Sequence, residues 1–121
     1  MSGDCLYRVI TALEWQRAQE TGWIPRSEVD QRDGFIHLSS AESFLETATR
    51  YFSPADRPLA LELDPSRLPG AIRWEAVPSR EQRFPHFYGS SLPLSAVRSI
   101  VELHPGGDGF AVGRRQELNA P

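Results

Sequence analysis

Three short segments of the sequence hold the residues best suited to chemistry. They are residues 33–39 (DGFIHLS), residues 73–75 (RWE) and residues 84–89 (FPHFYG). Each places a titratable side chain among apolar or aromatic neighbours. Polar groups of this kind that converge in a concavity are the usual signature of a ligand site. We expect one concave site lined by His37, Glu75, His86 and Arg8.

His37 lies in a short expected strand that ends at Ser39 and Ser40, where a helix is expected to begin. The start of a helix offers free N–H groups and a partial positive charge, which suit an anionic ligand. The sequence therefore predicts His37 as a catalytic residue and the N–H groups around Ser39 and Ser40 as a phosphate-binding site. The alternative is that His37 makes a local structural hydrogen bond.

Glu75 and Arg73 lie two positions apart in an expected strand, so their side chains share one face. A carboxylate in this setting can act as a catalytic acid or base. It can equally be one half of an ion pair with Arg73, since such pairs are common. We predict Glu75 as a catalytic residue, with the ion pair as the alternative.

The segment 84–89 is a dense aromatic stretch around His86 and Tyr88. Aromatic faces can stack on a planar ring such as a nucleobase or nicotinamide. We therefore predict His86 and Tyr88 as ligand-binding residues. The alternative is that the segment fills the open side of the core.

A metal site built from His37, His86 and Glu75 is possible by composition, because two histidines and a carboxylate form a known ligand set. The three residues do not form a local motif such as His-x-x-x-His, and Cys5 is the only cysteine. We expect no metal, and a metal-dependent hydrolase is one alternative function.

The elements that must position these residues follow from the apolar pattern. Strands are expected at residues 6–10, 35–38, 59–63, 72–77 and 97–103, with a last short one at 109–112. Thr11 and Ser39, each followed three residues later by glutamate, predict capping boxes that start two amphipathic helices. The late strands lack crossover helices, so we predict an α+β fold with a split, mostly antiparallel sheet.

Length and charge limit the classes of function. The 121 residues predict a single domain over 1–121, with a core at about 5–103 and a C-terminal tail at about 104–121. Thirteen basic residues, all arginine, against 16 acidic ones argue against general nucleic-acid binding. The sequence has no long apolar run and no basic leader, so we expect a cytoplasmic protein without a membrane segment.

These segments together resemble a small, mainly bacterial family of domains of unknown function with GFIHLS and FPHxYG motifs. The residues of this chain that carry the resemblance are Tyr7-Arg8, Glu14-Trp15, residues 33–39, Trp74-Glu75 and residues 84–89. The resemblance covers roughly residues 6 to 103. It implies the fold of the ADP-ribosyltransferases, in which a split antiparallel sheet cradles NAD.

In that fold Arg8 would face the pyrophosphate of NAD and residues 35–39 would match the second motif of the superfamily. Glu75 would stabilise the positive charge that develops on the ribose, with Glu102 on a late strand as the other possible carboxylate. The chain lacks a Gln/Glu-x-Glu motif, which argues against transfer to arginine.

The function that the resemblance implies is binding of NAD or another small phosphate-bearing nucleotide, with ADP-ribosyl or related transfer. NAD would be a substrate and no cofactor would be required. The alternative is a non-enzymatic domain of the same fold that binds an anionic ligand or a protein partner.

Overall fold

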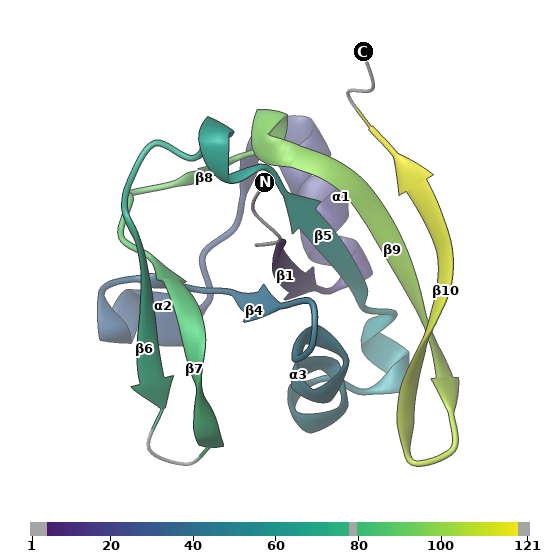
Figure 1. The fold of residues 1–121 in the computed structure, drawn as a ribbon. Helices are drawn as coiled ribbons and strands as arrows, with labels where there is room; N and C mark the ends of the chain where they lie inside the picture. Colours follow the sequence, from purple (N-terminus) through teal and green to yellow (C-terminus); the bar gives the residue numbers. More distant parts are fainter. Residues whose placement is uncertain (1–4, 78–79, 119–121) are drawn as a thin grey trace.

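The computed structural model describes residues 5–77 and 80–118, in which a five-stranded sheet forms the centre (Figure 1). Its strand order is β10-β9-β5-β1-β4, and every neighbouring pair is antiparallel. The strands are β1 (Leu6–Ile10), β4 (Ser39–Ser40), β5 (Leu59–Leu63), β9 (Val97–Gly106) and β10 (Gly109–Glu117).

Two smaller antiparallel sheets complete the β-structure. One has the order β3-β7-β6 and the other pairs β2 with β8. Their strands are β2 (Trp23–Ile24), β3 (Ile36–His37), β6 (Ile72–Val77), β7 (Arg80–Phe87) and β8 (Leu92–Pro93). β3 and β4 are separated by Leu38 alone yet belong to different sheets, so the chain crosses between the sheets at this point.

Within the described residues, three α-helices and three short 3₁₀ segments accompany the sheets, so the α+β class with mostly antiparallel pairing is confirmed. The α-helices are α1 (Ala12–Thr21), α2 (Glu28–Asp33) and α3 (Phe44–Tyr51); the 3₁₀ segments are η1 (Pro54–Asp56), η2 (Pro65–Arg67) and η3 (Leu94–Ala96). α1 begins with the predicted box between Thr11 and Glu14 and ends at Gly22, which has φ 86°.

The helix α2 lies in a stretch for which no helix was predicted. It begins with a capping box in which Ser27 and Asp30 each accept a hydrogen bond from the other's backbone N–H. It ends at Gly34, whose φ of 82° favours glycine. The expectation of two helices was therefore wrong by one.

The start of α3 differs from the expected one. The predicted box between Ser39 and Glu42 does not form, because Ser39 belongs to β4 and its hydroxyl hydrogen-bonds Thr47 inside the helix. The helix begins four residues later than the predicted box implies, with Ser43 in place of Ser39 as its N-cap and Phe44 as its first residue. Tertiary pairing of β4 with β1 has overridden a local capping signal.

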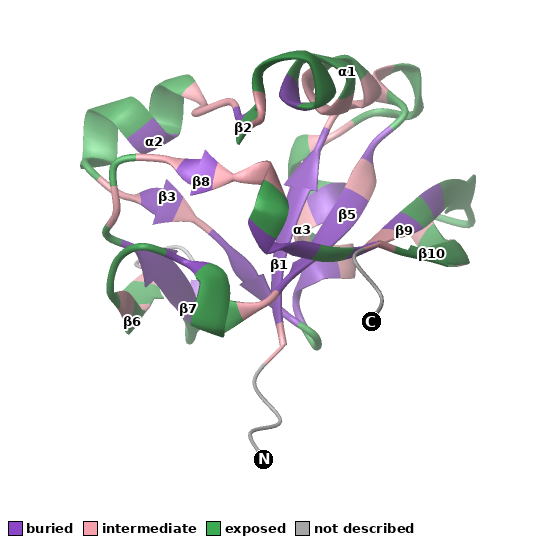
Figure 2. Cartoon of the chain, turned by 90° about the horizontal axis from the view of Figure 1, so that it is seen from above, coloured by how far each residue is buried: buried purple, intermediate pink, exposed green. Residues whose placement is uncertain are grey.

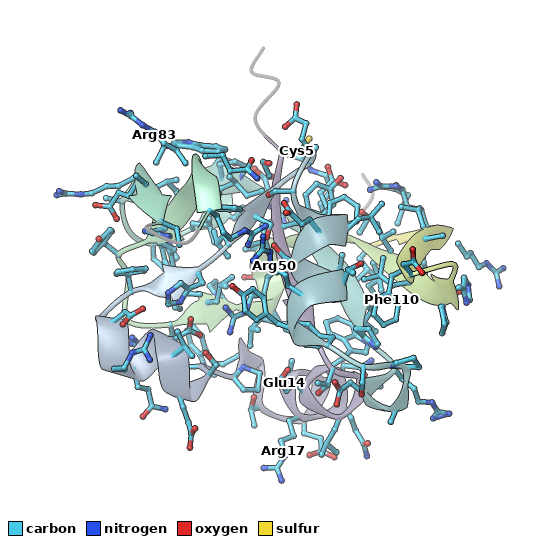
Figure 3. The ribbon with its side chains drawn as sticks, turned by 90° about the horizontal axis from the view of Figure 1, so that it is seen from below. Cys5, Glu14, Arg17, Arg50, Arg83 and Phe110 are labelled. Atoms are coloured by element: carbon cyan, nitrogen blue, oxygen red, sulfur yellow. The ribbon has the colours of Figure 1, made fainter. Side chains whose placement is uncertain are left out.

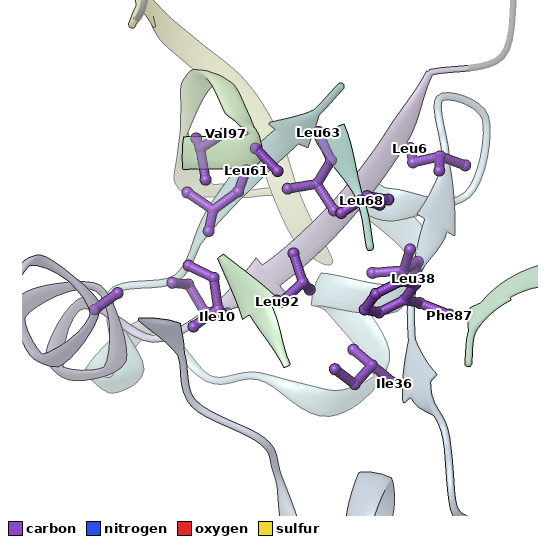
Figure 4. Packing of buried hydrophobic residues seen from close by; sticks show 13 residues of the cluster. Leu6, Ile10, Ile36, Leu38, Leu61, Leu63, Leu68, Phe87, Leu92 and Val97 are labelled. Carbon is purple, nitrogen blue, oxygen red and sulfur yellow. The ribbon is translucent and has the colours of Figure 1, made fainter. Parts of the chain in front are cut away.

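β1 and β5, in the middle of the central sheet, are buried on both faces, whereas β9 and β10 are partly exposed (Figure 2). One face packs against α3 through a cluster that includes Tyr7, Phe44 and Val101. The other face contributes Leu61 and Leu63 to a second cluster, which extends through Leu92 to Ile36 and Phe87 of the three-stranded sheet (Figure 4). The strand expected at 59–63 is thus present as β5 and is buried on both sides.

The segment after residue 103, expected to be a tail, forms the end of β9 and all of β10. The last three residues of the chain and residues 1–4 of the expected domain lie outside the described residues. None of the helices in the described part of the chain is long and apolar enough to cross a membrane.

Two single substitutions distinguish the observed capping box from the predicted one. Ser27→Ala removes the side chain that caps α2, and we expect it to lower the free energy of unfolding by about 1 kcal/mol. Glu42→Ala changes an exposed turn residue and should stay within about 0.5 kcal/mol of the wild type. Urea unfolding of both variants measures the difference, and the reverse ranking would contradict the assignment.

Candidate functional site

One face of the three-stranded sheet carries most of the predicted site residues. Antiparallel pairing places His37 of β3 opposite His86 of β7, which also lies opposite Arg73 of β6. Residues directly opposite one another share a face, and so do residues two positions apart. Glu75 and Tyr88 therefore lie on this same side. We call it the histidine face, made by Phe35, His37, Arg73, Glu75, His86 and Tyr88.

The aromatic rings of the histidine face touch one another. The ring centroids of His37 and His86 lie 5.5 Å apart, so the structure brings the two predicted histidines together. Phe35, which the sequence analysis did not single out, stacks on His86 at 4.1 Å and lies 4.6 Å from His37 and 5.2 Å from Tyr88. Its ring is the common neighbour of the other three.

Glu75 is held by two hydrogen bonds that end on the same oxygen. Tyr88 donates its hydroxyl to Oε1 at 2.6 Å, and Nδ1 of His86 lies 2.8 Å from the same atom. The bonds from Tyr88 and His86 lower the pKa of Glu75, and the same bond from its phenol raises the pKa of Tyr88. Glu75 is therefore an ionised carboxylate at neutral pH, and its side chain is 37% exposed.

His86 is the most enclosed of these side chains, with an exposed fraction of only 5%. An ionised carboxylate only accepts hydrogen bonds, so the hydrogen of the neutral His86 ring lies on Nδ1, facing Glu75. The other ring nitrogen, Nε2, is buried and has no hydrogen-bond partner among the described residues.

A buried carboxylate that the sequence analysis missed, Asp30 of α2, holds the other histidine. Its Oδ1 lies 2.7 Å from Nδ1 of His37 and accepts the backbone N–H of the same residue at 3.0 Å. Its Oδ2 accepts from Arg8 at 2.6 Å and from the backbone of Ser27 at 2.9 Å. Asp30 has no exposed side-chain surface, so every bond to it replaces lost hydration.

The environment of Asp30 keeps it ionised. Burial by itself raises the pKa of this carboxyl, but the hydrogen bond from His37 and the charge of Arg8 outweigh burial and hold the pKa well below its usual range. The signal that was missed is the spacing of Ser27 and Asp30, which matches a capping box with aspartate in place of glutamate.

Arg8 pairs mainly with the carboxylate of Asp30. It makes two bonds to Asp30 and donates a third, at 2.7 Å, to the backbone carbonyl of His37. The arginine is 7% exposed. The structure thus places Arg8 behind His37, with its charge neutralised, rather than on the histidine face.

The second ring nitrogen of His37 also meets a carboxylate. Nε2 lies 3.0 Å from Oδ2 of Asp33, at the end of α2. The pKa of Asp33 is lowered by hydrogen bonds from Arg32 and His37, so it too is ionised. Both ring nitrogens of His37 therefore face carboxylate oxygens, which only accept hydrogen bonds.

Ser39 and Ser40 are engaged within the fold. The Ser39 hydroxyl bonds to Thr47 at 2.9 Å, and the backbone N–H of Ser40 donates to the Ser43 hydroxyl at 2.8 Å. Because α3 begins only at Phe44, the helix start expected beside His37 is displaced from these residues.

Other features lie apart from the histidine face. Glu102 of β9 is half exposed and faces His104 at 3.4 Å, so the alternative carboxylate is on a different sheet from the two histidines. Within residues 5–77 and 80–118, no group of three or more His, Cys, Asp or Glu side chains is arranged to hold a metal ion. A shallow hollow near η1 is lined by Pro54, Arg57, His104 and Phe110 among others, and Glu102, the alternative carboxylate, also borders it.

Comparisons with known proteins place the chain beside structures of similar size. A family model described as "Protein of unknown function (DUF952)" matches residues 9–100. The crystal structure of protein CC0527 from Caulobacter crescentus is 34% identical, with a TM-score of 0.75 over 88% of this chain and 91% of that chain. Its solution NMR structure is also 34% identical, with a TM-score of 0.72 over 88% and 90%. No curated protein matches.

The depressed pKa of Asp30 predicts a pH dependence of stability. The pKa of Asp30 is lower in the folded protein than in the unfolded chain, where it is 3.8. Such a carboxyl stabilises the fold fully at pH values above 3.8, and this stabilisation is lost as the pH falls below that value. At pH 3 the wild type should lose about 1 kcal/mol through this group alone. Asp30→Asn should lack this part of the slope, and it should cost roughly 3–5 kcal/mol at pH 7 by leaving Arg8 unpaired.

Urea unfolding between pH 3 and 7 measures these slopes, with Asp108→Asn in an exposed turn as the control that keeps the wild-type slope. If Asp30→Asn does not fold, the carboxyl of Asp30 can be followed by NMR in the wild type. Titration of that signal near pH 4 would contradict the assignment.

Proposed function

Because the chain belongs to the DUF952 family of proteins of unknown function, we propose a function from the site itself: the histidine face binds a small phosphate-bearing nucleotide of the NAD class. The observation that carries this proposal is Glu75, an ionised carboxylate fixed by His86 and Tyr88 among aromatic rings. A fixed negative charge suits a ligand whose sugar becomes positive during reaction.

The rings supply a surface for a planar group. Tyr88 is 40% exposed, and Phe35 beside it is half-buried, so both present part of a ring to solvent. Stacking of a nucleobase or nicotinamide on such rings is tolerant of sequence and typically contributes about 1–3 kcal/mol per base. Two adjoining aromatic side chains favour a ring-bearing ligand over a simple anion.

Arg73 is the cation best placed for the phosphates. It is exposed, lies on the histidine face, and its guanidinium carbon is 5.2 Å from the centre of the Tyr88 ring. Arg8, Ser39 and Ser40 keep a role in this proposal through the position of His37 and β4, because their polar groups are already bonded. We therefore assign the phosphate contact to Arg73 and not to Arg8.

The reaction that fits this arrangement is transfer of an ADP-ribosyl group. The bond between ribose C1′ and the nicotinamide nitrogen breaks, and nicotinamide leaves with the bonding electrons. A nucleophile of the acceptor then bonds to C1′ and loses a proton. Glu75 stabilises the positive charge on the sugar between these events.

Calorimetric titration tests the binding step, with NAD, ADP-ribose and inorganic phosphate as separate probes. We expect NAD and ADP-ribose to bind more tightly than phosphate, since they add ring stacking to the charge contact. If none of them binds at millimolar concentration, the alternative of a non-enzymatic domain that binds a protein partner is favoured.

Replacement of Glu75 separates catalysis from binding. Glu75→Gln keeps the shape of the side chain and removes its charge, so NAD affinity should change little while nicotinamide release falls at least a hundredfold. Release measured by chromatography checks this, and Glu102→Gln on β9 should behave as the wild type. Equal loss of binding and release would identify Glu75 as a structural partner of His86.

Replacement of Arg73 tests the phosphate contact. Arg73→Gln should weaken ADP-ribose binding by about tenfold, because a charge-assisted hydrogen bond is lost. Arg83→Gln is the matched control, since Arg83 is an exposed arginine of β7 that projects outward from the other face of the same sheet (Figure 3). Calorimetry on both variants decides, and equal affinities would exclude Arg73 from the phosphate site.

A further inference from the structure

Nε2 of His86 is a buried polar atom without a partner, and it lies in the middle of the histidine face. Three other buried side-chain atoms share this property among the described residues, and all are Nε atoms of arginines. Each of those guanidiniums is bonded through its other nitrogens, to Asp30, Ser90 or Glu46 among others. Only the histidine nitrogen can accept a hydrogen bond.

The hydrogen-bond partner of Nδ1 decides what Nε2 can do. Nδ1 donates to the carboxylate of Glu75, and the tautomer that this bond selects carries a lone pair on Nε2. The two ring nitrogens of imidazole point in widely divergent directions, and Glu75 lies on β6. Nε2 therefore points away from β6, toward the side of the sheet where His37 lies.

His37 does not supply the missing donor. Its Nδ1 faces Asp30 at 2.7 Å and its Nε2 faces Asp33 at 3.0 Å, so both of its ring nitrogens are already engaged by other residues. Phe35 covers one face of the His86 ring and offers no polar atom. A buried acceptor left in this state costs free energy that a bound donor would recover.

We infer that Nε2 of His86 accepts a hydrogen bond from a sugar hydroxyl of the bound nucleotide, and that His86 thereby selects a ligand with a hydroxyl at that position. This inference rests on the proposed function and adds the group that the site recognises. A hydroxyl donates to such a lone pair, whereas a phosphate oxygen cannot.

Nε2 becomes accessible only if a neighbouring side chain moves, and Phe35 stacks on the His86 ring. The atom has almost no accessible surface, and the Phe35 ring stacked on His86 is partly exposed and follows Gly34, at φ 82°. The nucleotide would therefore displace the Phe35 ring, or insert beside it, as the hydroxyl reaches His86. A water molecule is the other donor small enough to occupy this position.

Nitrogen-15 NMR of the imidazole rings tests the inference in the wild-type protein. Without ligand, Nε2 of His86 should show the shift of an unprotonated nitrogen, and ADP-ribose should move it. A protonated Nε2, or a shift unchanged at saturating ADP-ribose, would overturn the inference while leaving the binding of ADP-ribose intact.

Calorimetry with the monodeoxy analogues of ADP-ribose identifies the hydroxyl. One analogue should bind the wild type roughly ten- to a hundredfold more weakly than ADP-ribose, because the buried acceptor stays unpaired. In His86→Phe that difference should disappear, and in the control His104→Phe, an exposed histidine of β9, it should persist.

The outcomes separate the two proposals. If every analogue binds as ADP-ribose does, a water fills the position and His86 selects nothing. If ADP-ribose itself does not bind the wild type, both the proposed function and this inference fail.

Discussion

A single buried carboxylate, Asp30, joins three parts of the fold that the histidine face depends on. It caps α2 through Ser27, pairs with Arg8 of the central sheet, and fixes both the backbone and the ring of His37 in β3. Separation of Asp30 from its partners would leave an unpaired buried charge, which costs on the order of several kcal/mol. This cost keeps the three parts of the fold in place. The position of His37 relative to the central sheet follows from that constraint.

Local signals in the sequence predicted elements well only where tertiary pairing did not compete with them. The box at Thr11 starts α1 as expected, whereas the similar pattern at Ser39 fails because that residue pairs with Tyr7 in the central sheet. The box at Ser27 was missed although it has the same spacing. A capping motif shows that side chains can form hydrogen bonds to a helix start. The helix begins there only if the backbone is not already paired in a sheet.

Successive side chains of β7 point to opposite sides of the sheet. The segment 84–89 can therefore both fill the core and present a polar side chain, the two alternatives that the sequence left open. Phe87 points into the core and has no exposed surface. His86, one position earlier, points to the opposite side and belongs to the histidine face. The sequence therefore predicted the filling of the core and the placement of a polar group, but not the register that brings His37 opposite His86. Register arises from pairing between strands about 50 residues apart, which no local pattern encodes.

The two histidines of this face are fixed in the same way and left in different states. Each directs Nδ1 at an ionised carboxylate, Asp30 for one and Glu75 for the other, which sets the orientation of both rings. Nε2 of His37 contacts the carboxylate of Asp33, whereas Nε2 of His86 has no hydrogen-bond partner among the described residues. The resemblance had assigned ligand contact to Arg8, yet burial makes Arg8 a support of this arrangement. Residues that carry a family signature can thus position a neighbouring side chain, and the two histidines differ in that only Nε2 of His86 has no hydrogen-bond partner within the part of the chain that the structure describes.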